Sequence, residues 1–397
     1  MSPIEKLAEQ VGFHNCYKNN LGEQVYASKE SRRALLKAMG YQVDNNQQIE
    51  ASLERLSNEP WLRLLPCTQI IKAEEESNGL LVTINEGQQS QLLNWKISTE
   101  YGEQLTGSVA LNDLSLVGKK IIDGIHYYQY TLPLPKVPLG YHKLEALTAD
   151  NLNKVSSCFL IVAPKSCYGP KDVSDDKMWG LAAQLYSLKS DHSWGIGDFS
   201  DLEKLVIQAA AQGASTIGLN PLHPLFPGNT AHRSPYSPTS RNFLNTIYID
   251  VTKVANYEQC EAATQLVNSA DFKARLEQAN QSALIDYPLT AALKYEVLEL
   301  LYRHFVEQHL NKATELSKEF EQFRAEFTVD LKVLATFDAL YEHFREKDFN
   351  AYGWMSWPVE YQDPNSAAVK EFQAKHSYRV GYFEFIQWLA DQQLANI

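Results

Sequence analysis

Two polar loops of this 397-residue chain carry the side chains best suited to contact a ligand. Ser234 and Tyr236 belong to a Ser-Pro-Tyr-Ser-Pro turn, whose prolines stiffen it and limit the entropy lost on binding. Trp194, Asn220 and His223 lie in or beside the same two loops. Aromatic rings, amides and hydroxyls are typical of ligand recognition, so the expected chemistry is binding. For Tyr236 the alternative is an ordinary loop aromatic, and for His223 a structural histidine.

A short strand on either side of one helix is expected to position these loops. The apolar run 180–188 and the segment 216–219 are typical of strands, and Asp198 is a helix N-cap before the periodic residues between them. Strand, helix and strand with short links form a βαβ unit, whose strands are parallel. Ligands bind at the C-terminal ends of such strands, and the loops 189–197 and 220–242 both lie there.

Asp198 is an acidic residue that invites a catalytic interpretation. Its position before the helix explains it without one, because its carboxylate can accept the free N–H groups of the first turn. Such hydrogen bonds stabilise the ionised form, so we expect the pKa of Asp198 to be lowered, which is the wrong direction for a general acid. Asp250, at the end of a later apolar segment, is expected to be structural. No residue is therefore assigned a catalytic role.

Four motifs follow one another in this region, and together they are more specific than any one alone. They read SWGIGDFSDL, GLNPLHPLFP, SPYSPTSR and FLNTIYIDV. In this order and spacing they resemble the amylomaltase (4-alpha-glucanotransferase) family, most closely the bacterial maltodextrin-pathway enzymes with extra N-terminal domains. The resemblance implies a variant (β/α)8 barrel that transfers α-1,4-glucan segments between maltodextrins. It also implies that Tyr236 packs against a sugar ring near the cleavage site, with Ser234 as a neighbouring polar contact.

Retaining glycosyl transfer needs a carboxylate nucleophile and a carboxylic acid roughly 5 Å apart. The family carries its carboxylates in Arg-x-Asp-His-like, Glu-Asp-Leu-Gly-like and Thr-His-Asp-like segments, and none of the three occurs in this sequence. The part after Trp179 is also shorter than the ~250 residues of a complete barrel. We therefore expect this chain to be the N-terminal part of such an enzyme, truncated before the catalytic carboxylates and inactive alone.

The length of the chain predicts several domains. Residues 1–60 are typical of a small helical unit, and residues 65–165 of an antiparallel, immunoglobulin-like β-sandwich. Residues 178–397 are expected to form the first part of a (β/α)8 barrel, with a large helical insertion at about 260–350. Within the sandwich, turn residues separate strand-like runs at 80–84, 92–97, 104–111, 127–132, 141–147 and 155–162.

The sandwich has two interpretations. In the first, Trp95, Tyr127 or Tyr128 is an aromatic platform of a starch-binding module. In the second it is a structural domain, which we favour because an analogy of fold does not by itself give a function.

The insertion is predicted from helical periodicity. An apolar stripe of one long amphipathic helix recurs every fourth residue, at Leu289, Leu293, Val297, Leu301 and Phe305. Further helices are expected around 313–327 and 329–346. The segment 353–358 that follows resembles another element of the family. The default expectation for the stripe is that it packs in the core.

The composition excludes some partners and is compatible with others. A formal net charge of −12 argues against nucleic acid and an anionic membrane surface, whereas neutral glycans are compatible with it. The five cysteines form no Cys-x-x-Cys pair, so neither a disulfide framework nor a zinc site is indicated. No metal-binding or phosphate-binding motif predicts a cofactor. Because the sequence has no signal-peptide or membrane-span pattern, we expect a reducing, cytoplasmic setting.

Three functions stay open at this point. The first is the 4-alpha-glucanotransferase that the resemblance implies, acting on maltodextrins and other α-1,4-glucans by a retaining double displacement. The second is a non-catalytic maltodextrin-binding protein, or an inactive fragment, with the same loops. The third is an interaction scaffold, in which the open strand edges of an unfinished barrel pair with another chain.

Overall fold

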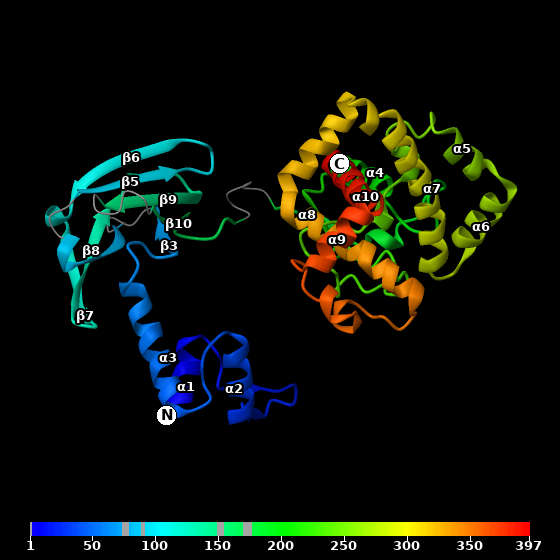
Figure 1. Ribbon diagram of the computed structural model, residues 1–397. Coiled ribbons are helices and arrows are strands. Elements are labelled where there is room, and N and C mark those ends of the chain that lie inside the picture. The colour runs from blue at the N-terminus through cyan, green and yellow to red at the C-terminus, as the bar shows by residue number, and fades with distance from the viewer. Residues whose placement is uncertain (1, 74–78, 89–91, 149–154, 170–176) are drawn as a thin grey trace. The chain divides into compact units, whose positions relative to one another are not determined.

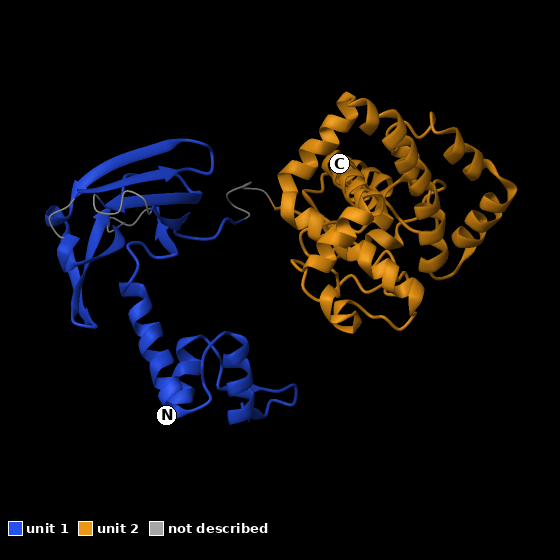
Figure 2. Cartoon of the chain, viewed as in Figure 1, with its two compact units in different colours: residues 1–169 blue, residues 170–397 orange. Residues whose placement is uncertain are grey.

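The computed structural model describes residues 2–73, 79–88, 92–148, 155–169 and 177–397. Its contacts divide the chain into two compact units, residues 1–169 and 170–397 (Figure 2). The sequence predicts a finer division of the first unit, with separate domains at 1–60 and 65–165, and that division stays a prediction.

The first unit begins with a group of helices around a small core. Its elements are α1 (Pro3–Gln10), β1 (Cys16–Lys18), β2 (Gln24–Tyr26), α2 (Lys29–Ala38), α3 (Asn46–Asn58) and the 3-10 turn η1 (Glu59–Trp61). The N–H of Ser2 donates to the carboxylate of Glu5 at 2.8 Å in a capping box, which starts α1. Leu7, Leu36 and Ile49, one from each helix, meet in the core.

A β-sandwich forms the rest of this unit. One sheet has the strand order β3-β10-β9-β5-β6 and the other β4-β8-β7. The strands are β3 (Thr68–Lys72), β4 (Gly79–Asn85), β5 (Leu92–Ser98), β6 (Gln104–Ala110), β7 (Ser115–Ile122), β8 (Ile125–Pro133), β9 (Gly140–Thr148) and β10 (Ser156–Ala163). Leu80 and Leu132 of one sheet share a buried core with Leu144 and Leu160 of the other. The predicted sandwich is therefore confirmed.

Two features of the sandwich differ from the sequence prediction. β3 and β10 pair in parallel, so the sandwich is not wholly antiparallel. In addition, β3 and β7 lie outside the predicted runs. β7 and β8 form a hairpin through Asp123 and Gly124, which both have positive φ, and an Asp-Gly pair is a strong signal of such a turn. β3 is a five-residue strand at the edge of its sheet.

The three aromatic residues considered as sugar platforms, Trp95, Tyr127 and Tyr128, are all partly buried. Trp95 lies against Gly107 of the neighbouring strand β6, which has no side chain to obstruct the ring. The ammonium group of Lys119 lies 5.6 Å from the ring centroid of Tyr128, which is a cation–π distance. These contacts favour the structural interpretation of the sandwich.

The second unit contains the predicted βαβ arrangement. β11 (Gly180–Ala183), α4 (Phe199–Ala211) and β12 (Thr216–Leu219) follow in order, and β11 pairs with β12 in parallel. The loops that follow the two strands therefore start at the same end of the pair. The apolar run from Gly180 is a strand only as far as Ala183, and Leu185–Ser187 form a 3-10 turn.

Helices make up much of the rest of this unit (Figure 1). They are α5 (Glu261–Asn268), α6 (Ala270–Gln281), α7 (Tyr287–Gln308), α8 (Glu315–Lys347), α9 (Ala367–Lys375) and α10 (Ser377–Ala395). α8 is interrupted at Thr328, where φ is 13° and ψ is −85°, between the helices predicted at 313–327 and 329–346. α10 runs through the middle of the unit, and every residue from Val380 to Ala390 is buried (Figure 1).

The apolar stripe of α7 packs in the core of its own unit. Leu293, Val297 and Leu301 are buried, and the ring centroid of Phe305 lies 4.8 Å from that of Phe385 on α10. Other faces of α7 are buried as well, since Leu298 and Tyr302 are also nearly inaccessible. None of the described helices combines the length and the apolar character that crossing a membrane requires.

Replacing Gly107 with alanine should destabilise the sandwich. A Cβ at this position would lie 2.2 Å from the Cζ2 atom of Trp95, and overpacking of this kind costs about 1–3 kcal/mol. We expect a lower midpoint of denaturant unfolding for the first unit of G107A. Gly87→Ala is the matched control, because its Cβ would meet its nearest neighbour at an ordinary 3.6 Å. Equal stability of the two variants would contradict this account of Trp95.

Candidate functional site

Ser234 and Tyr236 lie in one exposed turn. The N–H of Ser237 donates to the carbonyl oxygen of Ser234 at 3.1 Å, which closes a β-turn with Pro235 at its second position. The side chain of Tyr236 is 73% exposed, so its ring and its hydroxyl are accessible. Nε2 of His232 lies 3.0 Å from the carbonyl oxygen of Ser237 and braces the turn. The two residues predicted to contact a ligand are thus brought together.

Hydrogen bonds join the two arms of the loop that carries this turn. The N–H of Thr239 donates to the carbonyl oxygen of Pro224 at 3.0 Å. Further along, the N–H of Asn245 donates to the carbonyl oxygen of Leu222 at 2.8 Å. Because both arms are fastened, the turn with Tyr236 projects from a loop whose path is fixed.

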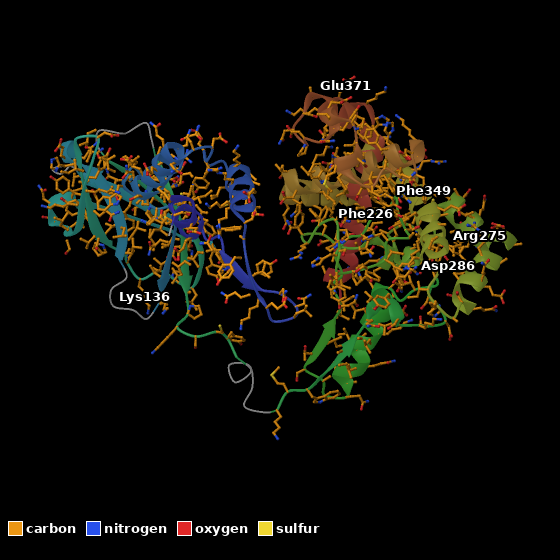
Figure 3. The ribbon with its side chains drawn as sticks, turned by 90° about the horizontal axis from the view of Figure 1, so that it is seen from below. Lys136, Phe226, Arg275, Asp286, Phe349 and Glu371 are labelled. Atoms are coloured by element: carbon orange, nitrogen blue, oxygen red, sulfur yellow. The ribbon has the colours of Figure 1, made fainter. Side chains whose placement is uncertain are left out.

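Phe226 fastens the same loop to α8. Its ring centroid lies 5.1 Å from that of Tyr341, and Figure 3 shows Phe226 among the side chains inside the second unit. The amide nitrogen of Asn229 donates to the hydroxyl of Tyr341 at 3.3 Å. The loop and α8 are therefore held together by ring packing and by a buried hydrogen bond.

A cavity of about 670 Å³ lies between this loop and α8. Its lining combines aromatic rings with amide and hydroxyl groups. The lining includes Pro238, Thr239 and Asn242 from the loop, Phe337 and Tyr341 from α8, and Tyr352 and Trp354 from the segment after α8. Such a lining suits an uncharged ligand with apolar faces and hydroxyl groups. In the chain, only one residue separates Tyr236 from Pro238 of this lining.

The described lining of the cavity contains no carboxylate pair for glycosyl transfer. Asp330 is the only carboxylate among the described residues that line it, whereas a retaining reaction uses two carboxyl groups roughly 5 Å apart. Across the described ranges, no group of three or more His, Cys, Asp or Glu side chains is placed to hold a metal ion. The chemistry that this lining supports is the binding of a ligand.

Trp194, also predicted for the site, is mostly enclosed by the core. Its side chain is 6% exposed and packs edge to face on Phe272 of α6, with ring centroids 5.2 Å apart. It borders a separate cavity of about 540 Å³ that Asp198 and Asp250 also line. Its contact with a ligand stays a prediction, and this burial leaves little ring surface for one.

Asn220 and His223 lie at the start of the loop that follows β12. Oδ1 of Asn220 accepts a hydrogen bond from the N–H of Leu185 at 3.1 Å, which joins the segments after β11 and β12. His223 is half-buried in the loop. Asn220 thus has a structural partner in the backbone, and the roles of both residues toward a ligand stay predictions.

Side chains of α6 and α7 hold the loop 189–197. The N–H of Gly195 donates to Oδ1 of Asn280 at 2.7 Å. Lys294 is fully buried; its ammonium group donates to the carbonyl oxygen of Ile249 at 2.9 Å and lies 3.6 Å from a carboxylate oxygen of Asp198. One ammonium group therefore joins α7, the start of α4 and the backbone at Ile249, which follows the loop 220–242 (the site loop).

Asp198 caps α4 as predicted, because its Oδ1 accepts hydrogen bonds from the N–H groups of Ser200 at 3.1 Å and Asp201 at 3.3 Å. The predicted lowering of its pKa was wrong. Burial raises the pKa of Asp198; Lys294 opposes this rise and Asp250 adds to it. Burial likewise lowers the pKa of Lys294. The local sequence identifies the cap but carries no measure of how deeply the cap is buried.

The aromatic wall of the cavity was missed by sequence reasoning. Phe337 and Tyr341 occupy ordinary positions of a predicted helix, and no motif contains Tyr352. The one available signal is the segment 353–358, which includes Trp354 and resembles an element of the family. About a hundred residues separate this wall from the site loop, so its position depends on how the helices pack.

Comparison with known protein families covers both units of the chain. The family described as 4-alpha-glucanotransferase matches residues 183–397. The family described as the MalQ N-terminal beta sandwich domain matches residues 64–164, which contain the strands β3 to β10. The two matches agree with a multi-domain protein in which a sandwich precedes the unit that carries the site.

Individual relatives are similar over much of the chain. A 4-alpha-glucanotransferase from Haemophilus influenzae is 31% identical over 76% of this chain and 42% of its own length. One from Mycobacterium bovis is 28% identical over 99% of this chain and 52% of its own length. The crystal structure of amylomaltase from Corynebacterium glutamicum matches with a TM-score of 0.73 at 25% identity, over 99% of this chain and 52% of that one. The chain spans about half the length of the curated relatives it matches.

Replacing Lys294 with methionine should destabilise the second unit strongly. Removing one partner of a buried ion pair costs about 3–5 kcal/mol, because the other charge stays buried without compensation. The measurement is denaturant unfolding of K294M and of the double variant K294M/D198N. The asparagine keeps the helix cap without a charge, so the double variant should recover part of the loss.

The same variant should show a pH dependence of known sign. Burial raises the folded-state pKa of Asp198 above its unfolded value, so its ionised form costs stability as pH rises through the folded pKa. Without Lys294 this cost is larger. The free energy of unfolding lost in K294M should therefore be greater near pH 7 than near pH 4, because a larger fraction of Asp198 is ionised at the higher pH. A loss independent of pH, or no recovery in the double variant, would contradict the role given to this pair.

Proposed function

The chain belongs to the 4-alpha-glucanotransferase family, and on that premise we propose that the protein transfers α-1,4-glucan segments between maltodextrins by a retaining double displacement. The observation that carries the proposal is the accessible turn with Ser234 and Tyr236 beside a cavity lined by aromatic rings and amides. The name shared by the relatives favours a transferase over a non-catalytic maltodextrin-binding protein.

The surface of an α-1,4-glucan matches this site in its chemistry. A glucose ring has an apolar C–H face, which packs on an aromatic ring, and a perimeter of hydroxyl groups, which need donors and acceptors. In the proposal the exposed ring of Tyr236 packs on one sugar, and the hydroxyl of Ser234 contacts its perimeter. Trp354 and Asn242 provide the same two kinds of contact within the cavity.

The parallel pair of the second unit fits a barrel architecture. We propose that β11 and β12 are the first strands of a (β/α)8 barrel, and that the helices from α5 to α8 are the insertion predicted at about 260–350. In such a barrel the loops after these strands lie on the catalytic face. Asn220, His223 and Trp194, in or beside these loops, are proposed as weaker contacts to the substrate.

Substrate binding is proposed for this chain, and transfer for the protein as a whole. The sequence contains no match to the three carboxylate segments of the family. Incubation with maltotriose, followed by chromatography of the products, separates the alternatives. New maltodextrins longer than maltotriose support transfer. If the full-length protein binds maltotriose but forms no new products, the transferase proposal is contradicted and the non-catalytic maltodextrin-binding protein is favoured.

The remaining proposals concern the setting and the partners. All five cysteines are free in the described structure, which supports the proposed reducing, cytoplasmic location. The net charge of −12 supports neutral glucans as partners over nucleic acid or an anionic membrane.

Tyr236→Ala should weaken the binding of maltoheptaose by about tenfold, or ~1.4 kcal/mol, because it removes the accessible ring of the turn. The measurement is isothermal titration calorimetry. Tyr101→Ala is the matched control, since Tyr101 is an equally exposed tyrosine (77%) in the first unit. The site assignment fails if both variants bind maltoheptaose as tightly as the unaltered chain.

A further inference from the structure

Gln387, at the centre of α10, holds the backbone at the end of the site loop. Its Oε1 accepts a hydrogen bond from the N–H of Leu244 at 3.2 Å, and its Nε2 donates to the carbonyl oxygen of Leu244 at 2.9 Å. The side chain is 5% exposed, so water does not compete for these bonds. One amide group thus satisfies both polar groups of one residue, as a neighbouring strand would in a sheet.

The residues immediately before Leu244 form one wall of the cavity. Asn242 and Phe243 both line it, and the ring centroid of Phe243 lies 5.8 Å from that of Phe327 on α8. A shift of Leu244 would therefore move two lining residues. Loss of the amide would leave the partly buried N–H and C=O of Leu244 without these partners, which favours a rearrangement of the backbone.

Glu384, one turn before Gln387 on the same helix, holds α8 on both sides of its interruption. Glu384 is 1% exposed. Oε2 lies 2.9 Å from Nε of Arg324, which precedes the interruption at Thr328. Oε1 lies 3.3 Å from Nζ of Lys332, which follows it. One carboxylate is therefore within ion-pair distance of both parts of α8, and the link is electrostatic, because Oε2 has no hydrogen-bond partner of good geometry.

The part of α8 after Thr328 is the opposite wall of the cavity. Leu334, Phe337 and Tyr341 lie there and line the space. The angle between the two parts of α8 decides how far these side chains stand from the site loop. Glu384 is thus placed to act on that angle, because its carboxylate lies within ion-pair distance of both parts.

We propose that Glu384 and Gln387 are positioning residues that together set the width of the glucan-binding cavity. They lie at i and i+3 of one buried helix, so both point outward from the same side of α10. One holds the α8 wall and the other holds the wall made by the loop. The assignment of the ligand as a glucan rests on the proposed function, whereas the fixing of the two walls rests on the contacts alone.

The test compares Glu384→Gln and Gln387→Met with a control on the same helix. In E384Q the amide has one acceptor oxygen and cannot hold both Arg324 and Lys332. In Q387M both bonds to Leu244 are lost with little change in size. The control is Gln393→Met, because Gln393 makes the same two-way amide contact with Asp250, at 2.8 Å in each direction, beyond the cavity wall.

We expect E384Q and Q387M to bind maltoheptaose about tenfold more weakly, and Q393M to bind it within about twofold of the unaltered chain. Q387M and Q393M lose matching hydrogen bonds, so we expect similar losses of thermal stability in the two variants. A loss of affinity in Q387M alone then reflects the position of the cavity wall and not a general loss of stability. Equal affinities in Q387M and Q393M would overturn the positioning role of Gln387. An unchanged affinity in E384Q would overturn that of Glu384.

Hydrogen–deuterium exchange keeps the proposal testable without a ligand. E384Q should speed exchange in residues 329–341, and Q387M in residues 240–246, while Q393M leaves both segments unchanged. If the unaltered chain bound no glucan, the proposed function would fail, and the exchange result would still decide whether these residues fix the two walls. Unchanged exchange in both segments would overturn the positioning role.

Discussion

Buried backbone groups need hydrogen-bond partners, and this constraint governs the second unit. Between β12 and α5 the described chain forms 3-10 turns but no strand, so its N–H and C=O groups have no β-ladder. Side chains replace that ladder. Gln387 and Gln393 of α10 pair with the backbone of Leu244 and Asp250, and Lys294 of α7 donates to the carbonyl group before Asp250. Gln387 thus holds the backbone next to the site loop, whereas Gln393 and Lys294 hold the later segment at residues 249–250.

Charges buried in this block are arranged to fix the helices relative to one another. A buried charge is costly unless it is paired, so each pair ties together the elements that supply it. Lys294 and Asp198 join α7 to α4, and Glu384 joins α10 to both parts of α8. Asp338 of α8 differs from these residues, because burial raises its pKa well above the ordinary value and favours the neutral carboxyl group.

Rigidity of the loops has a direct consequence for the proposed binding of glucans. A long, flexible polysaccharide loses conformational freedom when it binds, and a site that is already ordered adds little to that cost. The proline-bounded turn with Tyr236, the fastened arms of its loop and the ring packing of Phe226 on Tyr341 all restrict the free state. An ordered turn and loop therefore favour the glucan binding that we propose for this chain.

Elements with local signals follow from the amino-acid sequence alone. Capping, helical periodicity and proline-bounded turns act within a few residues, so the βαβ unit, the break in α8 and the turn shared by Ser234 and Tyr236 lie where these signals predict. The parallel pair of β3 and β10, the aromatic wall, the burial of Trp194 and the raised pKa of Asp198 were not predictable in this way. Each depends on segments far apart in the chain, because packing between distant elements settles which side chains lose water and which face a cavity.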